Sequence, residues 1–180
     1  MKPFVHLHLH SEYSLLDGAA KIEKLFDACK ANNMPSVALT DHGVMYGAVE
    51  FFKAAKAAGV KPIFGCEFYV AKDHKDKQGK EMDHLVLLAK DLTGYKNIIK
   101  LNSIAFVHGF YYKPRIDFNL LKQYSKGTVC LSGCLAGSVP RLLLKGKFDE
   151  AKELALKYKN LFDEGDYYIE IQDHGLKEQK

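Results

Sequence analysis

Phe4-Val5-His6-Leu7-His8-Leu9-His10-Ser11 places a histidine at every second position of the first segment of the chain. Successive side chains of a β-strand point to opposite faces, so a strand here presents the three histidines on one side and Val5, Leu7 and Leu9 on the other. We predict that the aliphatic face is buried and that the histidine face coordinates a metal ion, since imidazole is the commonest protein ligand for zinc-like ions. A core strand with hydrogen-bonded histidines is the alternative.

Strand-like and helix-like runs alternate along the rest of the chain, which indicates an α/β fold with a mostly parallel sheet. The predicted strands are 4–9, 36–40, 62–70, 84–89, 128–132 and 167–171. The predicted helices are 22–31, 45–58, 95–106, 118–124 and 148–162. No linker rich in Gly, Pro or Ser divides the 180 residues, so we expect one domain. A closed barrel of seven or eight units typically needs about 200 to 250 residues. We therefore expect either a fragment of a larger protein or an open sheet.

The composition is that of an ordinary globular domain, with 47% hydrophobic and 27% charged residues. No apolar run approaches the ~20 residues of a membrane span, and histidines stand where a signal peptide has its apolar stretch. Four cysteines, at 29, 66, 130 and 134, form no CxxC pair, which fits a reducing compartment, and Cys130 is expected to pack in the core. We expect a cytoplasmic protein without a membrane partner. The net charge of +4 is compatible with a phosphate-bearing partner.

In parallel α/β folds, functional groups gather where the strands end. The first predicted strand delivers His8 and His10 to this edge. The turn after it supplies Asp17, which is either a metal ligand or the N-cap of the next helix. The second predicted strand ends beside His42. The third carries Glu67 among apolar neighbours, where an unpaired charge is costly, so either a metal cation or a lysine is expected as its partner.

Two further candidates come from later strands. His84 opens the fourth predicted strand, and Cys134 follows the fifth in a run of small residues that suits a thiolate ligand. The remaining histidines are weaker candidates. His74 and His108 are expected on the surface, and His174, after the sixth strand, is a second-tier ligand candidate.

The number of these groups bears on the kind of metal site. Seven side chains at one edge, four of them imidazoles, exceed what one tetrahedral zinc ion binds, so we favour a cluster of two or three ions. Closely spaced metals with His and carboxylate ligands suit the hydrolysis of phosphate esters, because they generate hydroxide at neutral pH and hold the attacking and leaving oxygens. A single structural zinc ion is the alternative.

Four short motifs match those of a known family. In order along the chain they are His8-Leu9-His10-Ser11, Thr40-Asp41-His42-Gly43, Gly65-Cys66-Glu67 and Ser132-Gly133-Cys134. They resemble the metal-site motifs of the PHP (polymerase and histidinol phosphatase) superfamily. Longer segments are similar to the amino-terminal PHP domains of the bacterial DNA polymerase III α-subunit family; these segments are 10–18, 59–65, 84–90, 111–117 and 170–176.

The resemblance implies a fold and a ligand set. The fold is a distorted (βα)7-type barrel truncated to about six strands, so that residues 1–180 are the N-terminal fragment of a larger polymerase chain. The last barrel strand and its Asp-x-His metal motif are expected to be missing because the sequence stops before them; Asp173 and His174 are adjacent and match a different segment of the family. Two or three divalent ions (zinc, manganese or iron) are implied. Their ligands fall on His8, His10, Asp17, His42, Glu67, His84 and Cys134. The catalytic group implied consists of His8, His10, His42 and Glu67.

The resemblance also implies an activity and partners. The family's domains with an intact metal set are associated with 3′-5′ exonuclease proofreading during DNA replication, and the polymerase elements lie downstream. The implied partners are the DNA primer 3′ end and the other subunits of the replicase holoenzyme. Lys113 and Arg115 are candidates for holding the DNA backbone, although a solvated loop is an equal reading of that segment. A structural module that binds partner subunits is the alternative function, and a histidinol-phosphatase-like small-molecule phosphatase is a third.

Overall fold

The computed structural model describes residues 4–179, which fold into one mixed sheet with helices packed around it. The strands are β1 (Ser36–Leu39), β2 (Lys61–Val70), β3 (Asp83–Ala89), β4 (Arg115–Ile116), β5 (Thr128–Leu131) and β6 (Tyr167–Tyr168). The helices are α1 (Ile22–Ala31), α2 (Ala48–Ala58), α3 (Leu92–Val107), α4 (Phe118–Tyr124), α5 (Ser138–Leu144) and α6 (Phe148–Lys159), followed by a 3-10 turn, η1 (Lys177–Gln179). The predicted α/β class is confirmed.

The strand order is β1-β2-β3-β5-β6, with β4 pairing to β2. The pairs β1 with β2, β2 with β4 and β5 with β6 are parallel, whereas β3 is antiparallel to both β2 and β5. Reversal of β3 places its first residues beside the last residues of β2, so that His84 pairs with Tyr69. The His84 side chain, at the start of β3, therefore lies at the same edge of the sheet as the side chains at the end of β2.

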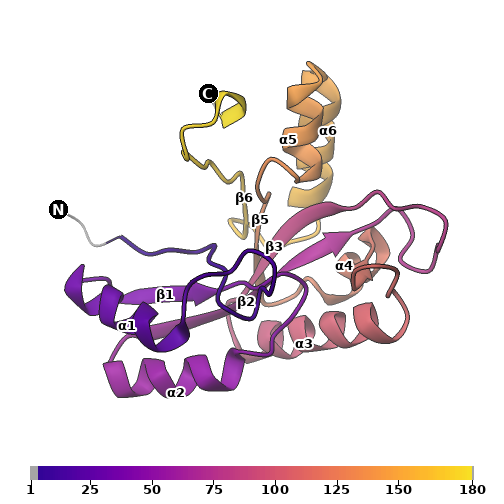
Figure 1. Ribbon diagram of the computed structural model, residues 1–180. Coiled ribbons are helices and arrows are strands. Elements are labelled where there is room, and N and C mark those ends of the chain that lie inside the picture. The colour runs from indigo at the N-terminus through magenta and orange to yellow at the C-terminus, as the bar shows by residue number, and fades with distance from the viewer. Residues whose placement is uncertain (1–3, 180) are drawn as a thin grey trace.

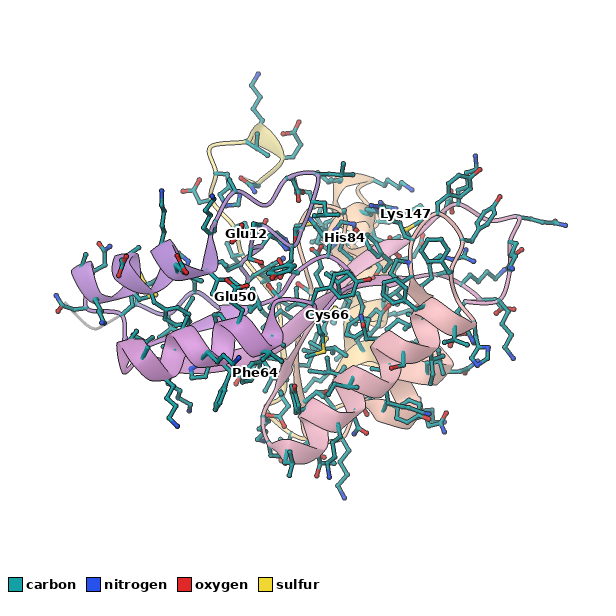
Figure 2. The ribbon with its side chains drawn as sticks, turned by 60° about the horizontal axis from the view of Figure 1, so that its bottom comes forward. Glu12, Glu50, Phe64, Cys66, His84 and Lys147 are labelled. Atoms are coloured by element: carbon teal, nitrogen blue, oxygen red, sulfur yellow. The ribbon has the colours of Figure 1, made fainter. Side chains whose placement is uncertain are left out.

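The helices cover the outer face of the sheet in groups. Figure 1 shows α1 and α2 together beside β1 and β2, α3 and α4 along another side, and α5 packed on α6 near β5 and β6. Along β2 the side chains alternate, and Cys66 and Phe68 join Ile98 and Leu101 of α3 in the largest apolar cluster. Figure 2 shows Cys66 between β2 and α3. Glu67 lies between Cys66 and Phe68 in the sequence of β2, so its side chain is turned to the inner face of the sheet.

The first segment is not the regular strand that its alternation predicts. The amide of Ala38 donates to the His6 carbonyl (2.8 Å) and that of Thr40 to the Leu9 carbonyl (2.9 Å), but a bend at residues 7–8 interrupts the pairing with β1. Leu7 is 40% exposed, so the prediction of a buried aliphatic face was wrong there. A segment with incomplete pairing loses the strict two-residue period, which is why His6 and His8 have different surroundings.

Several element boundaries also differ from the sequence prediction. Strand β4 and helix α5 were not predicted, and β6 ends at Tyr168 whereas the prediction extended to 171. Helix α5 contains Pro140, which reads as a helix breaker in sequence but is tolerated because it lies in the first turn. Helix α3 begins earlier than predicted because the Asp91 side chain accepts a hydrogen bond from the Gly94 amide.

The sheet does not close into a barrel within residues 4–179. Its two ends in the strand order are β1 and β6, as expected for an incomplete barrel. The segments flanking these ends nevertheless meet, because Nδ1 of His8 lies 2.7 Å from Oε1 of Glu170. No helix among the described residues is both long and apolar enough to cross a membrane.

Arg115 fastens the excursion between β2 and β3 to the body of the domain. Its side chain is 1% exposed and donates to the carbonyls of Gly109 (3.1 Å), Gly79 (3.0 Å) and His74 (3.2 Å), and also to that of Asp76. A buried guanidinium with its donors committed to backbone carbonyls is not free to bind a DNA phosphate. Arg115 is therefore removed from the candidates for DNA contact.

Replacing Arg115 with alanine should lower the free energy of unfolding by about 2 to 4 kcal/mol, because several carbonyls lose a charged donor and a buried volume empties. Urea denaturation of the variant and the parent chain measures the difference. The matched control is Lys122→Ala, an exposed cation on α4, which should change stability by less than about 0.5 kcal/mol. Equal effects of the two substitutions would show that Arg115 does not fasten this loop.

Candidate metal centre

Glu67 lies at the centre of the candidate site. The side chain is 1% exposed, and imidazoles from three other segments surround it. Oε1 lies 3.2 Å from Nε2 of His8 and 3.2 Å from Nδ1 of His84. Oε2 is in close contact with Nδ1 of His42 and lies 3.9 Å from Nε2 of His10. One buried carboxylate thus faces four imidazoles.

The two remaining predicted ligands, Asp17 and Cys134, contact histidines of this group and not Glu67 itself. Oδ2 of Asp17 is 3.0 Å from Nε2 of His42, and Sγ of Cys134 is 3.6 Å from Nδ1 of His84. The structure therefore brings all seven predicted side chains into one contact network. The N-cap alternative for Asp17 was wrong, because Lys21 occupies the N-cap position of α1.

A second buried carboxylate holds the loop that carries Asp17. Asp41 accepts hydrogen bonds from the Ser11 amide (2.6 Å), the Ser11 hydroxyl (2.8 Å) and the Ser14 hydroxyl (2.7 Å). The loop is tight, since a Cβ on Gly18 would lie 1.8 Å from the Ser11 carbonyl oxygen. These contacts fix the loop that extends from His10 to Asp17 over the end of β1.

The turn after β5 brings Cys134 to His84. Gly133 has φ +81°, a conformation that favours glycine. A Cβ at this position would lie 2.7 Å from the His84 carbonyl oxygen. The close approach of these two backbones places the Cys134 thiol beside the His84 ring.

The other histidines lie outside this network. His6 is exposed, and its ring meets that of Phe4 edge to face. His108 is exposed, as predicted, and so is His174, whose amide donates to the Gln179 side chain. The prediction of a surface position for His74 was wrong: its ring is buried against Asp117. Cys130 is fully buried in the core, as predicted.

The imidazoles keep Glu67 ionised. Burial raises the pKa of its carboxyl group, but the surrounding imidazoles outweigh burial and hold the pKa far below its ordinary range. Burial and the nearby His42 charge lower the pKa of His10. Burial raises the pKa of the Cys134 thiol, but the contact with His84 outweighs it and lowers the pKa. The site thus favours anionic carboxylate and thiolate, which are the ligand forms.

Two imidazoles carry strongly raised pKa values. Burial lowers the pKa of His8, but the carboxylates of Glu170 and Glu67 raise it to about 10. Burial likewise lowers the pKa of His84, whereas Cys134 and Glu67 raise it to about 9. Protons on these rings balance the buried negative charge in the absence of a cation.

The donor set fits metal ions. Within this network, two groups each offer three ligand atoms that lie within 4.8 Å of one another. One group is His8, His10 and Glu67, and the other is His42, Glu67 and His84. Both Glu67 oxygens, Nε2 of His8 and Nδ1 of His42 are buried and have no hydrogen-bond partner of good geometry within residues 4–179. Buried polar atoms without partners are costly, and a pair of cations sharing Glu67 would satisfy them.

The site opens into a cavity of about 1820 Å³ on the inner face of the sheet. Its walls combine the predicted ligands with apolar side chains from the first segment, β2 and the residues after β6. The carboxylate and imidazoles are therefore accessible from this cavity.

Sequence reasoning missed Glu170, which lies two residues after β6 and contacts His8. Its position in the chain could have identified it as a candidate, because Glu170 follows a strand at the edge where the other candidates gather. The predicted strand ran to residue 171 and so treated Glu170 as part of a regular strand.

A comparison with family models decides the assignment. The model described as "PHP domain" matches residues 6–174, which include every side chain of the network. The chain belongs to the PHP domain family. The resemblance drawn from the short motifs is confirmed.

Relatives of this PHP domain carry the name of a DNA polymerase subunit. The protein named DNA polymerase III subunit alpha in Borreliella burgdorferi is 51% identical over 181 residues, covering 98% of this chain and 16% of that protein. Its namesake in Thermus aquaticus is 47% identical over 185 residues, covering 98% of this chain and 15% of that protein. The chain thus spans about one sixth of the length of these relatives. A Bacteroides vulgatus structure, titled as a two-domain protein with a predicted PHP-like metal-dependent phosphoesterase, aligns with TM-score 0.44 and 14% identity over 86% of this chain and 48% of its own.

Metal affinity should rise with pH between pH 7 and pH 9. The pKa values of about 10 for His8 and about 9 for His84 mean that both rings are protonated at pH 7 without metal, and each must lose a proton to act as a ligand. The stability of the metal-free protein should change with pH in the opposite direction. The contribution of His8 to the free energy of unfolding is fully present below pH 6.5, and it is lost as the pH rises through its folded-state pKa of about 10.

Calorimetric titration with zinc in two buffers of different ionisation enthalpy measures the protons released. We expect about one proton or more per ion at pH 7. An affinity that is constant from pH 7 to pH 9, with no proton release, would contradict the assignment of these rings as ligands.

Proposed function

We propose that this chain is a metal-dependent phosphoesterase domain of a DNA polymerase III α subunit and removes nucleotides from DNA 3′ ends. The observation that carries the proposal is the buried carboxylate of Glu67, which is shared by two groups of metal-type ligands. The names and similarity of the relatives support the replicase setting. The polymerase activity of the whole subunit, its DNA substrate and its partner subunits are part of the proposal.

Each predicted ligand has a place in this proposal. His8 and His10 would hold one ion, His42 and His84 the other, and Glu67 would serve both. Asp17, beside His42, and Cys134, beside His84, would add further ligands. A mixture of imidazole, carboxylate and thiolate suits zinc, manganese or iron. When bound, such ions supply hydroxide at neutral pH and stabilise negative charge on the phosphate oxygens.

Lys113 is the residue best placed to hold the phosphate backbone. Its ammonium nitrogen lies 5.4 Å from the centre of the Tyr69 ring. That ring in turn packs against His84 (5.2 Å between centres) and His42 (6.2 Å). A partly exposed cation therefore sits at the margin of the ligand network, where it can attract the phosphate groups that flank a scissile bond.

A purely structural role for the metal is the second candidate. The ligands come from segments that extend from His8 to Cys134, so bound ions would tie most of the chain together. Removing one ligand distinguishes the two roles. If the variant does not fold, the metal has a structural role. If the variant folds but no longer hydrolyses its substrate, the metal has a catalytic role.

Glu67→Gln should abolish binding of at least one metal ion and lower hydrolysis of a 3′-labelled single-stranded oligonucleotide by about a hundredfold or more. The amide keeps the shape of the side chain but not its charge. Elemental analysis, an exonuclease assay and a thermal melt on the same preparation test this. The control is His108→Ala, an exposed histidine outside the network, which should keep both metal and activity. Full hydrolysis by the Glu67 variant would rule out this site.

Lys113→Ala should raise KM for single-stranded DNA about three- to tenfold with kcat almost unchanged, because the ammonium contacts phosphate and not the reacting metal site. The dependence of log KM on log salt concentration should become shallower by about 0.7 to 1. Lys122→Ala serves as the matched surface control. A fall in kcat at constant KM would contradict this assignment of Lys113.

A further inference from the structure

Glu170 approaches the metal centre from the opposite end of the sheet. It follows β6, whereas His8 belongs to the segment beside β1, and the two residues are 162 positions apart. Oε1 of Glu170 lies 2.7 Å from Nδ1 of His8, and both side chains are nearly buried, at 11% and 10% exposure. A short contact across two edges of an open sheet requires that both backbones are held in place.

The backbone and side chain of Glu170 are indeed held. Its amide donates to the Ser132 hydroxyl (2.9 Å), which ties the segment to the end of β5. The Gln172 side-chain amide donates to the same oxygen that faces His8, at 2.7 Å. Oε1 therefore has a fixed position, set by β5 on one side and by the chain after β6 on the other.

The geometry decides which nitrogen of His8 is available to a metal. An ionised carboxylate only accepts hydrogen bonds, so Nδ1 of His8 must carry a hydrogen toward Glu170. The other nitrogen, Nε2, points to Glu67 and has no hydrogen-bond partner of good geometry within the described chain. A carboxylate that holds the far nitrogen of a ligand histidine fixes the ring's tautomer and orientation and raises its basicity.

We propose that Glu170 is the positioning residue of the metal centre, which holds His8 with Nε2 directed at the ion shared with His10 and Glu67. The inference rests on the proposed metal site and adds the residue that orients its first ligand. Glu170 acts through His8 and does not itself contact the ion. Closure between the two ends of the sheet thereby becomes part of the metal site.

The test compares zinc binding by the parent chain, Glu170→Ala and Glu170→Gln, with Glu164→Ala as the control for an exposed acid near the same strand. Chelator competition gives affinity, elemental analysis gives stoichiometry, and nitrogen NMR of the histidine side chains in the zinc-loaded proteins reports the His8 tautomer. We expect Glu170→Ala to weaken zinc binding 10- to 100-fold at unchanged stoichiometry and to lose the Nδ1-protonated signal of His8. Glu170→Gln keeps an acceptor oxygen, so its loss should be smaller and the tautomer should persist.

Three results would overturn the inference. If Glu170→Ala binds zinc as the parent does, the carboxylate does not position His8. If it loses one ion completely and keeps the other at parent affinity, Glu170 is itself a ligand. If the parent chain binds none of zinc, manganese and iron, the proposed function fails together with the inference, whereas the first two results leave that function standing. Should the alanine variant not fold, the glutamine variant still decides through its tautomer signal and affinity.

Discussion

The buried carboxylate of Glu67 is the constraint around which this domain is arranged. An ionised group at 1% exposure is strongly unfavourable unless charges and dipoles replace the lost water, so the fold must deliver partners to it. It delivers imidazoles from the first segment, from the loop after β1 and from the start of β3. The rings of His8, His42 and His84 compensate the charge, and a divalent cation would use the same rings as ligands. Stability and the proposed metal binding therefore depend on one set of contacts.

The reversed direction of β3 is what makes this set complete. In an all-parallel sheet the first residue of a strand lies at the edge away from the functional groups, and His84 would be lost from the site. Because β3 is antiparallel to its neighbours, His84 pairs with Tyr69 at the end of β2 and comes within reach of Glu67 and Cys134. The topology of one strand therefore controls a quarter of the imidazole set.

Apolar packing and polar support are divided between the two faces of the sheet. On the outer face, α3 packs on β2 and β3 through buried residues such as Phe68, Leu87 and Leu101, which belong to the largest hydrophobic cluster. On the inner face and at the strand ends, Asp41 and Glu170 hold the segments that carry the predicted ligands through hydrogen bonds. Packing of the helices on the outer face offsets the unfavourable free energy of burying charged groups on the inner face of the sheet.

The sequence by itself determined the α/β class and most of the helices, and its motifs identified seven side chains that the structure brings into contact, because alternation and strand-end position are local properties of the chain. Only the tertiary structure decided the direction of β3, the interrupted pairing of the first segment and the different surroundings of His6 and His8. It also assigned Arg115 and His74 to the interior and brought Glu170 to His8. These features depend on contacts between residues far apart in the chain, and a charged or imidazole side chain carries no local sign of whether its partner is water, a buried carbonyl or a metal ligand.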